Sequence, residues 1–319
     1  MMITRDVEYY AEGEKILGRL CLPDDYEKGQ KLPCIVTATG YTGIRPIYLE
    51  LMGRHLTKYG YATLGFDFRH MPPSDGPVMQ LTFESTFEDV VASIVFAQEQ
   101  PEVDPDKIAL YGWGQGGVLT MKAAAEVPDV KAVACVNSWY NFERQIKDSM
   151  GADFYCDLIK KAKADRAHRV LTGETRYYAF TEFGGKDPVI LDENGNEKAA
   201  YAENALASME NAGEIEAWQE KYYKDNWPPH TCYVSFDSFL RVRAEEFVQK
   251  IAPRGLFLVG STKDTVYPYS ETQHIYDAAG PGKFLYTVDD YHSSWMMDGH
   301  PEFDKFLVSL VKFYDMYLK

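Results

Sequence analysis

Short apolar runs alternate with helix-like segments over the first 136 residues of the chain. The runs are rich in apolar and β-branched residues, and they predict buried strands at 34–38, 62–66, 108–111 and 132–136. Helical spacing of the apolar residues predicts helices over 48–59, 87–97 and 118–125. Because parallel strands are joined by helices that cover both faces of a sheet, this alternation predicts a doubly wound, mostly parallel sheet.

Both ends of the chain extend this pattern. Residues 3–10 and 16–22 favour an antiparallel hairpin, and apolar strands return at 255–259 and 283–288. The last segment predicts an amphipathic helix, whose apolar face holds Phe303, Phe306, Leu307, Leu310, Tyr314 and Tyr317. We therefore expect an α/β fold with a sheet of about eight strands. This C-terminal helix could form the interface of a homodimer, although packing against the core explains its apolar face equally well.

The alternation is interrupted between residues 139 and 246. This stretch contains loops rich in glycine, proline and aromatic residues, and an acidic, polar section at 200–226 that is predicted to be helical. Since the alternation of strands and helices resumes afterwards, we interpret 139–246 as a cap inserted into the core. The core then consists of residues 1–138 and 247–319.

The charge balance narrows the class of partner. The chain has 33 Lys and Arg against 48 Asp and Glu, and this net charge of −15 argues against nucleic acid and against anionic membranes. The hydrophobic share of 45% is ample for a packed core. Part of the acidity lies in the inserted stretch, at Asp192, Glu193, Glu197, Glu203, Glu210, Glu214, Glu216 and Glu220. An acidic outer face of the cap would favour a neutral, apolar substrate.

Cysteine usage and the first residues of the chain indicate a reduced, cytoplasmic setting. The five cysteines are widely spaced and include no C-x-x-C pair, so neither a disulfide framework nor a zinc site is predicted. No histidine pair has metal-ligand spacing. No signal-peptide region is visible, and no apolar stretch approaches the ~18 residues that span a bilayer. No G-x-G-x-x-G follows a first strand and no Walker loop is present, so no cofactor is implied.

The most informative segment is IALYGWGQGG at residues 108–117, which runs from a strand through a glycine-rich turn into a helix. It resembles the nucleophile elbow of α/β-hydrolases, G-x-S-x-G, in which a strained turn presents the nucleophile. Gly112, Gly116 and Gly117 match the small residues that let strand and helix pack closely. The nucleophile position itself is occupied by Gly114.

Two later turns provide an acid and a base. Asp264 lies in GSTKDTVYP, after the strand at 255–259, and His292 lies in VDDYHSS, after the strand at 283–288. The first turn resembles the acid-bearing turn of α/β-hydrolases, and the second resembles their histidine loop. The order of nucleophile position, Asp and His is also that of the superfamily.

Two earlier loops complete the resemblance. TGYTG at 39–43 stands where the superfamily carries its oxyanion loop, with Thr39 in place of the usual His. DFRHMPPSDG at 67–76 resembles a D-x-R-G-x-G-x-S-x-G loop, with His70 where Gly is usual. The phrase KIAPRG at 250–255 is typical of dienelactone-hydrolase-like and prolyl-peptidase-like esterases and related polyketide acyl hydrolases. The chain is similar to this group over nearly its whole length, apart from the inserted stretch.

The resemblance implies a role for each site residue. His292 would act as the general base, and Asp264 would fix its tautomer. The backbone N–H groups of Tyr41 and Gln115 would form the oxyanion hole. The implied reaction is hydrolysis of an ester, a thioester or a C–C bond next to a carbonyl. The implied partner is a small apolar or aromatic acyl substrate.

Four further residues are candidates for substrate binding: Trp113, His70, Trp139 and Tyr140. The aromatic side chains of the inserted stretch suit an apolar pocket, and they suit the interior of a cap equally well. For His70, the sequence favours a loop position near the mouth of the pocket over direct contact with substrate.

Gly114 cannot form an acyl-enzyme, nor can it act as an Asp or Cys nucleophile. Three interpretations stay open. The chain could carry an introduced, inactivating Ser-to-Gly replacement. It could be a natural lyase, isomerase or general-base hydrolase in which His292 acts without a nucleophile, or a pseudoenzyme that only binds a ligand. The retained Asp264 and His292 favour the first two, since a drifting pseudoenzyme has no physical reason to keep an acid–base pair. The inactivating replacement is our leading hypothesis.

Overall fold

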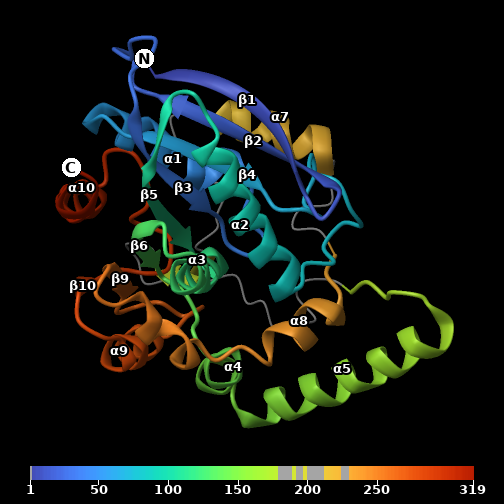
Figure 1. The fold of residues 1–319 in the computed structure, drawn as a ribbon. Helices are drawn as coiled ribbons and strands as arrows, with labels where there is room; N and C mark the ends of the chain where they lie inside the picture. The colour runs from blue at the N-terminus through green and yellow to red at the C-terminus, as the bar shows by residue number, and fades with distance from the viewer. Residues whose placement is uncertain (1, 179–188, 192–196, 200–211, 224–229) are drawn as a thin grey trace.

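A mixed sheet of eight strands lies at the centre of the molecule, in the order β1-β2-β4-β3-β5-β6-β9-β10. The structure is a computed structural model that describes residues 2–178, 189–191, 197–199, 212–223 and 230–319 (Figure 1). The strands are β1 (Ile3–Ala11), β2 (Glu14–Leu22), β3 (Leu32–Ala38), β4 (Ala62–Asp67), β5 (Val103–Trp113), β6 (Val130–Val136), β9 (Gly255–Ser261) and β10 (Lys283–Val288). The predicted strands and hairpin are confirmed.

The direction of the strands determines where the loops meet. β1 pairs with β2 and β2 pairs with β4 in antiparallel fashion, whereas all other neighbours in this sheet are parallel. The strands from β4 to β10 therefore end at one edge of the sheet. In open α/β sheets the crevice at this carboxyl edge is where ligands bind.

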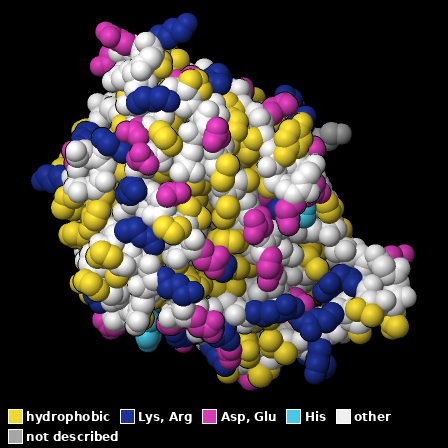
Figure 2. Space-filling model, in the orientation of Figure 1, with side chains coloured by type: hydrophobic (Ala, Val, Ile, Leu, Met, Phe, Trp, Pro, Cys, Tyr) yellow, Lys and Arg dark blue, Asp and Glu magenta, His cyan; other side chains and the backbone are white. Residues whose placement is uncertain are grey.

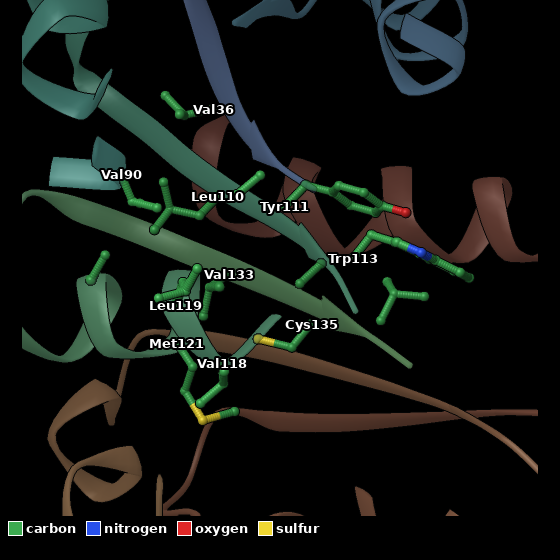
Figure 3. Packing of buried hydrophobic residues seen from close by; sticks show 14 of the residues in the cluster. Val36, Val90, Leu110, Tyr111, Trp113, Val118, Leu119, Met121, Val133 and Cys135 are labelled. Atoms are coloured by element: carbon green, nitrogen blue, oxygen red, sulfur yellow. The ribbon is translucent and has the colours of Figure 1, made fainter. Parts of the chain in front are cut away.

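Helices cover both faces of the sheet. α2 (Phe83–Gln98) and α3 (Gln115–Glu126) pack on one face, and α1 (Arg45–Leu56) and α10 (Pro301–Leu318) pack on the other (Figure 1). Because side chains alternate along a strand, β5 serves both layers. Figure 3 shows Leu110 beside Val90 of α2, whereas Tyr111 and Trp113 point to the opposite side. The predicted doubly wound arrangement is thus confirmed.

Several elements begin earlier than the apolar pattern predicts, and α1 and β5 show why. α1 begins at Arg45 because charge, not apolar periodicity, holds its first turn. The Arg45 backbone N–H donates to Asp67 Oδ1 at 2.9 Å, and its buried guanidinium pairs with Asp67 and Glu50. β5 begins at Val103, which pairs with Leu32 across a register shift.

The inserted stretch contributes several separate elements. They are α4 (Phe142–Met150), α5 (Ala152–Thr172), the antiparallel pair β7 (Val189–Leu191) and β8 (Glu197–Ala199), α7 (Ala212–Tyr223) and α8 (Tyr233–Phe239). α5 projects from the molecule and contacts α4 and α8, while α7 contacts α1 (Figure 1). Of the helix predicted at 200–226, only α7 falls within the described residues. The cap boundaries 139–246 stay a prediction.

The expected acidic face of the cap does not extend over α5. Figure 2 shows Lys and Arg side chains gathered at the lower right, where α5 lies. The exposed basic residues of this helix include Lys160, Lys161, Lys163 and Arg166. Glu216 and Glu220 of α7 are exposed as predicted, whereas Asp192, Glu193, Glu203 and Glu210 lie outside the described residues.

Candidate active site

The elbow, the acid and the base meet at the carboxyl edge of the sheet. Gly114 follows β5, Asp264 follows β9 and His292 follows β10. The parallel register pairs Gly112 with Cys135 and Val136 with Val259, so these strands end side by side. Residues that are far apart in the sequence are thereby brought to one place.

Gly114 adopts the backbone conformation of a strained turn, with φ of +56° and ψ of −127°. Its N–H donates to the Val136 carbonyl at 3.0 Å, and its own carbonyl accepts from the Gly117 N–H at 3.0 Å. A Cβ at position 114 would lie 3.2 Å from Gly40 Cα and 3.7 Å from Tyr267 Cε2. A small side chain at this position therefore costs backbone strain and requires Gly40 to shift by a few tenths of an ångström.

The neighbouring glycines are required by close packing. A Cβ on Gly112 would lie 2.2 Å from the Gly116 carbonyl oxygen, and one on Gly116 would lie 2.3 Å from the Ala38 carbonyl oxygen. Because the obstructing atoms belong to the backbone, they cannot rotate away. The predicted role of these glycines in joining strand and helix agrees with these distances.

We expect Gly116→Ala to lower the free energy of unfolding by about 3 kcal/mol, since the added methyl group overpacks the turn against β3. Urea unfolding measures this loss. Gly213→Ala on α7 is the matched control, because a Cβ there meets no atom within 4 Å. Equal unfolding midpoints for the two variants would contradict the packing described for the turn.

Asp264 and His292 form a buried pair. His292 Nδ1 lies 2.6 Å from Asp264 Oδ2, and both side chains are almost fully buried. The other carboxylate oxygen, Oδ1, accepts from the N–H groups of Val266 and Tyr267, each at 2.8 Å. Because an ionised carboxylate can only accept, Nδ1 carries the proton and Nε2 of a neutral imidazole is left as a base.

The loop that carries His292 is anchored by Asn137. Its Nδ2 donates to the His292 carbonyl at 2.6 Å and to Ser261 Oγ at 2.9 Å. Trp295 Nε1 donates to the same Ser261 oxygen at 3.0 Å. Asn137 directly follows β6 and has a positive φ of +43°, which asparagine tolerates better than most residues. Sequence reasoning missed Asn137, although a polar residue straight after a buried strand was a usable signal.

The two predicted oxyanion donors carry free N–H groups. Gln115 is the first residue of α3, so its N–H has no partner within the helix. The N–H of Tyr41 makes no hydrogen bond to any residue that the structure describes. Tyr41 follows Gly40, whose Cα is the nearest atom to a Cβ at position 114. A helix N-terminus beside the elbow also favours negative charge.

The Tyr41 side chain connects this loop to the inserted stretch. Its hydroxyl hydrogen-bonds to the Thr231 hydroxyl, and its ring lies 5.5 Å from Phe239 and 6.0 Å from Phe236 on α8. Burial raises the pKa of the Tyr41 hydroxyl, which therefore stays protonated at neutral pH. The inserted stretch thus lies directly over the predicted oxyanion loop.

A second link joins the inserted stretch to the acid side of the site. Glu271 on α9 (Tyr269–Ala278) is fully buried and accepts from the N–H groups of Tyr140 and Asn141, each at 2.9 Å. It also pairs with the guanidinium of Arg144 on α4. Sequence reasoning missed Glu271, because nothing in its local pattern indicates so distant a partner.

The four predicted substrate-binding residues have different surroundings. Trp113 is buried, and its ring lies 5.2 Å from that of His292, so it packs against the base. Trp139 and Tyr140 have practically no exposed surface; Trp139 packs against Phe142 and Phe239. They occupy the interface between core and inserted stretch, and substrate contact stays a prediction for both.

His70 is held within its own loop rather than beside the acid–base pair. Its Nδ1 lies 2.7 Å from the Gln80 carbonyl oxygen, and its Nε2 lies 3.4 Å from Glu14 Oε2. The loop position predicted for it agrees with these contacts. Substrate contact by His70 stays a prediction.

Metal and membrane features can be assessed for the described residues. Among them, no group of three or more His, Cys, Asp or Glu could hold a metal ion. No described helix is long and apolar enough to cross a membrane. The five cysteines are free, and burial raises the pKa of the Cys34 thiol to about 12, which suits an inert core residue.

Comparison with known proteins places this geometry among related folds. The profile of the acetyl xylan esterase (AXE1) family matches residues 73–179, which include Gly114. Thiohydrolase aneE of Aspergillus aculeatus is 23% identical over 295 residues, covering 92% of this chain and 87% of that protein. Polyketide transferase ATR5 of Stachybotrys chlorohalonatus is 24% identical over 237 residues, covering 72% and 74%.

A solved structure agrees over the full length. The α/β hydrolase GrgF from Penicillium sp. sh18 has a TM-score of 0.74 at 20% identity, covering 99% of both chains. The expected α/β-hydrolase fold is thereby confirmed. The chain is an α/β-hydrolase in fold, and its relatives include proteins of the esterase and thiohydrolase type.

Proposed function

We propose that the protein is an esterase- or thioesterase-type α/β-hydrolase whose site binds an apolar, polyketide-like acyl substrate. In the present chain Gly114 would remove the covalent step. The observation that carries this proposal is the buried Asp264–His292 pair, held at 2.6 Å at the same sheet edge as the strained turn at Gly114. The names of the thiohydrolase and polyketide transferase relatives support the acyl class of substrate.

The geometry fits the steps of acyl transfer. With a serine at position 114, its hydroxyl proton would pass to His292 Nε2 while Oγ attacks the carbonyl carbon. Asp264 would stabilise the imidazolium through Nδ1–H, and His292 would then protonate the leaving oxygen or sulfur. The N–H groups of Tyr41 and Gln115 would bind the oxyanion. With glycine at 114 the covalent step is lost. Substrate binding, the general base His292 and the stabilisation of the oxyanion would be retained.

A second candidate is an enzyme that needs no nucleophile. The observation in its favour is the positive φ of Gly114, a conformation that glycine adopts without strain. Glycine is thus the residue that the turn itself prefers. His292 would then act directly on water or on a substrate proton, giving general-base hydrolase, lyase or isomerase chemistry.

One set of measurements separates these candidates. The unaltered protein and His292→Ala are assayed for turnover of p-nitrophenyl hexanoate and a hexanoyl thioester. Binding of the hydrolysis-resistant amide N-(4-nitrophenyl)hexanamide is measured by calorimetry. The proposal expects amide binding by both proteins with negligible turnover. Turnover by the unaltered protein that His292→Ala abolishes would favour the second candidate. Absence of binding would contradict the proposed substrate class.

A further inference from the structure

We propose that Tyr267 is a substrate-binding residue of this site, with its ring as a wall beside the reaction centre and its hydroxyl as a hydrogen-bond donor to an oxygen of the acyl substrate. The inference rests on the proposed function and adds a residue to it. Neither the elbow motif nor the acid–base pair assigns this tyrosine a role.

The first observation is the position of the ring. A Cβ at residue 114 would lie 3.7 Å from Tyr267 Cε2, which is the carbon next to the one that bears the hydroxyl. The same ring meets His292 edge to face, with centroids 5.2 Å apart and planes at 80°. Tyr267 is therefore in contact distance of the nucleophile position and of the base at once.

The second observation is how the ring is held there. The Tyr267 N–H donates to Asp264 Oδ1 at 2.8 Å, while Asp264 Oδ2 faces His292 Nδ1 at 2.6 Å. One carboxylate therefore positions both the base and the tyrosine. A residue whose backbone is anchored in this way loses less conformational entropy when it orients a ligand.

The third observation concerns the hydroxyl. It makes no hydrogen bond to any residue that the structure describes, and Tyr267 as a whole is only partly buried. The hydroxyls of Tyr111 and Tyr140 also lack partners, but those groups are sealed inside the protein. The Tyr267 hydroxyl is therefore the one of these three that a ligand can reach.

The chemistry of the hydroxyl decides what it can bind. Burial raises the pKa of Tyr267, with a further contribution from the nearby Asp264 carboxylate, so the phenol keeps its proton at neutral pH. The neighbouring Tyr41 hydroxyl is already engaged with Thr231. The Tyr267 hydroxyl is thus a protonated donor without a partner beside the reaction centre. An oxygen of an acyl ester or thioester could accept a hydrogen bond from it.

The test removes one oxygen atom and keeps the ring. In a protein that carries Gly114→Ser, Tyr267→Phe is expected to lower kcat/KM for p-nitrophenyl hexanoate about fivefold to tenfold, as for one lost hydrogen bond. Tyr269→Phe is the matched control, because the exposed Tyr269 hydroxyl hydrogen-bonds to Thr287 of β10, away from the site. We expect the control to stay within about twofold, and both variants to keep the thermal midpoint of their parent.

The outcomes distinguish this inference from the proposed function. If the serine protein turns over ester and the two variants are equally active, Tyr267 is not a substrate contact and the proposed function stands. If the serine protein is inactive, binding of N-(4-nitrophenyl)hexanamide to the unaltered chain decides. Weaker binding for Tyr267→Phe alone supports the inference, and equal affinities overturn it. Absence of binding by every protein overturns both proposals.

Discussion

Gly114→Ser is expected to raise the turnover of p-nitrophenyl hexanoate on the order of 10³-fold or more, because it supplies the one group that covalent catalysis lacks. The base is in place, with Nδ1 of His292 held by Asp264 and Nε2 left to accept a proton. The new Cβ would lie 3.7 Å from Tyr267 Cε2 and 3.2 Å from Gly40 Cα, so Gly40 must shift by a few tenths of an ångström to admit the serine side chain. Initial rates under pseudo-first-order conditions, with a burst phase for acylation, measure the gain.

The gain in activity should come with a loss of stability. A side chain at φ of +56° is strained, so we expect Gly114→Ser to lower the free energy of unfolding by about 1–3 kcal/mol. Gly114→Ala is the control, since it adds the same strain without a nucleophile. It should lose similar stability and gain no activity. Equal activities of the Ser and Ala variants would contradict the assignment of position 114.

In the serine protein, Asp264→Asn is expected to lower kcat roughly 10³- to 10⁴-fold. An amide can donate to His292 Nδ1, so it would stabilise the tautomer that carries its proton on Nε2, where a base is needed. It would also remove the negative charge that stabilises the imidazolium. Steady-state kinetics with p-nitrophenyl hexanoate measure the loss.

Asp289→Asn provides the matched control for this substitution. Asp289 lies on the exposed surface, where it accepts from the Thr262 hydroxyl at 2.8 Å and pairs with Lys263. Surface pairs of this kind contribute little, so kcat should be unchanged within about twofold. If Asp264→Asn were as active as Asp289→Asn, the 2.6 Å contact between Asp264 and His292 would not contribute to catalysis, and the assigned role of Asp264 would be wrong.

Much of the fold could be predicted because the strands are buried on both faces. Continuous apolar runs such as 34–38 and 132–136 leave few alternatives, and the loops after parallel strands must share an edge. That rule alone brings Gly114, Asp264 and His292 together, and the 2.6 Å contact between the last two agrees with it.

The supporting residues depend on details that local pattern does not contain. Glu271 is recognisable only once α9 and α4 are placed, because its partners lie at the start of the inserted stretch, more than 100 residues earlier in the chain. Tyr267 belongs to the acid-bearing turn that the sequence identifies. The direction of its ring could not be predicted, because it depends on the path of that turn in space. Trp139 and Tyr140 were predicted to bind substrate because the inserted stretch is rich in aromatic residues. Such a composition does not distinguish the wall of a pocket from a buried interface, and both side chains are buried.

Covalent labelling of position 114 tests the central claim most directly. A serine-directed fluorophosphonate is incubated with the unaltered protein, with Gly114→Ser, and with Gly114→Ser combined with His292→Ala, and adducts are located by peptide mass spectrometry. The account predicts one adduct, on the serine at 114, that forms quickly only when His292 is present, and none on the unaltered chain. An unlabelled serine at 114, or labelling at the same rate without His292, would contradict it.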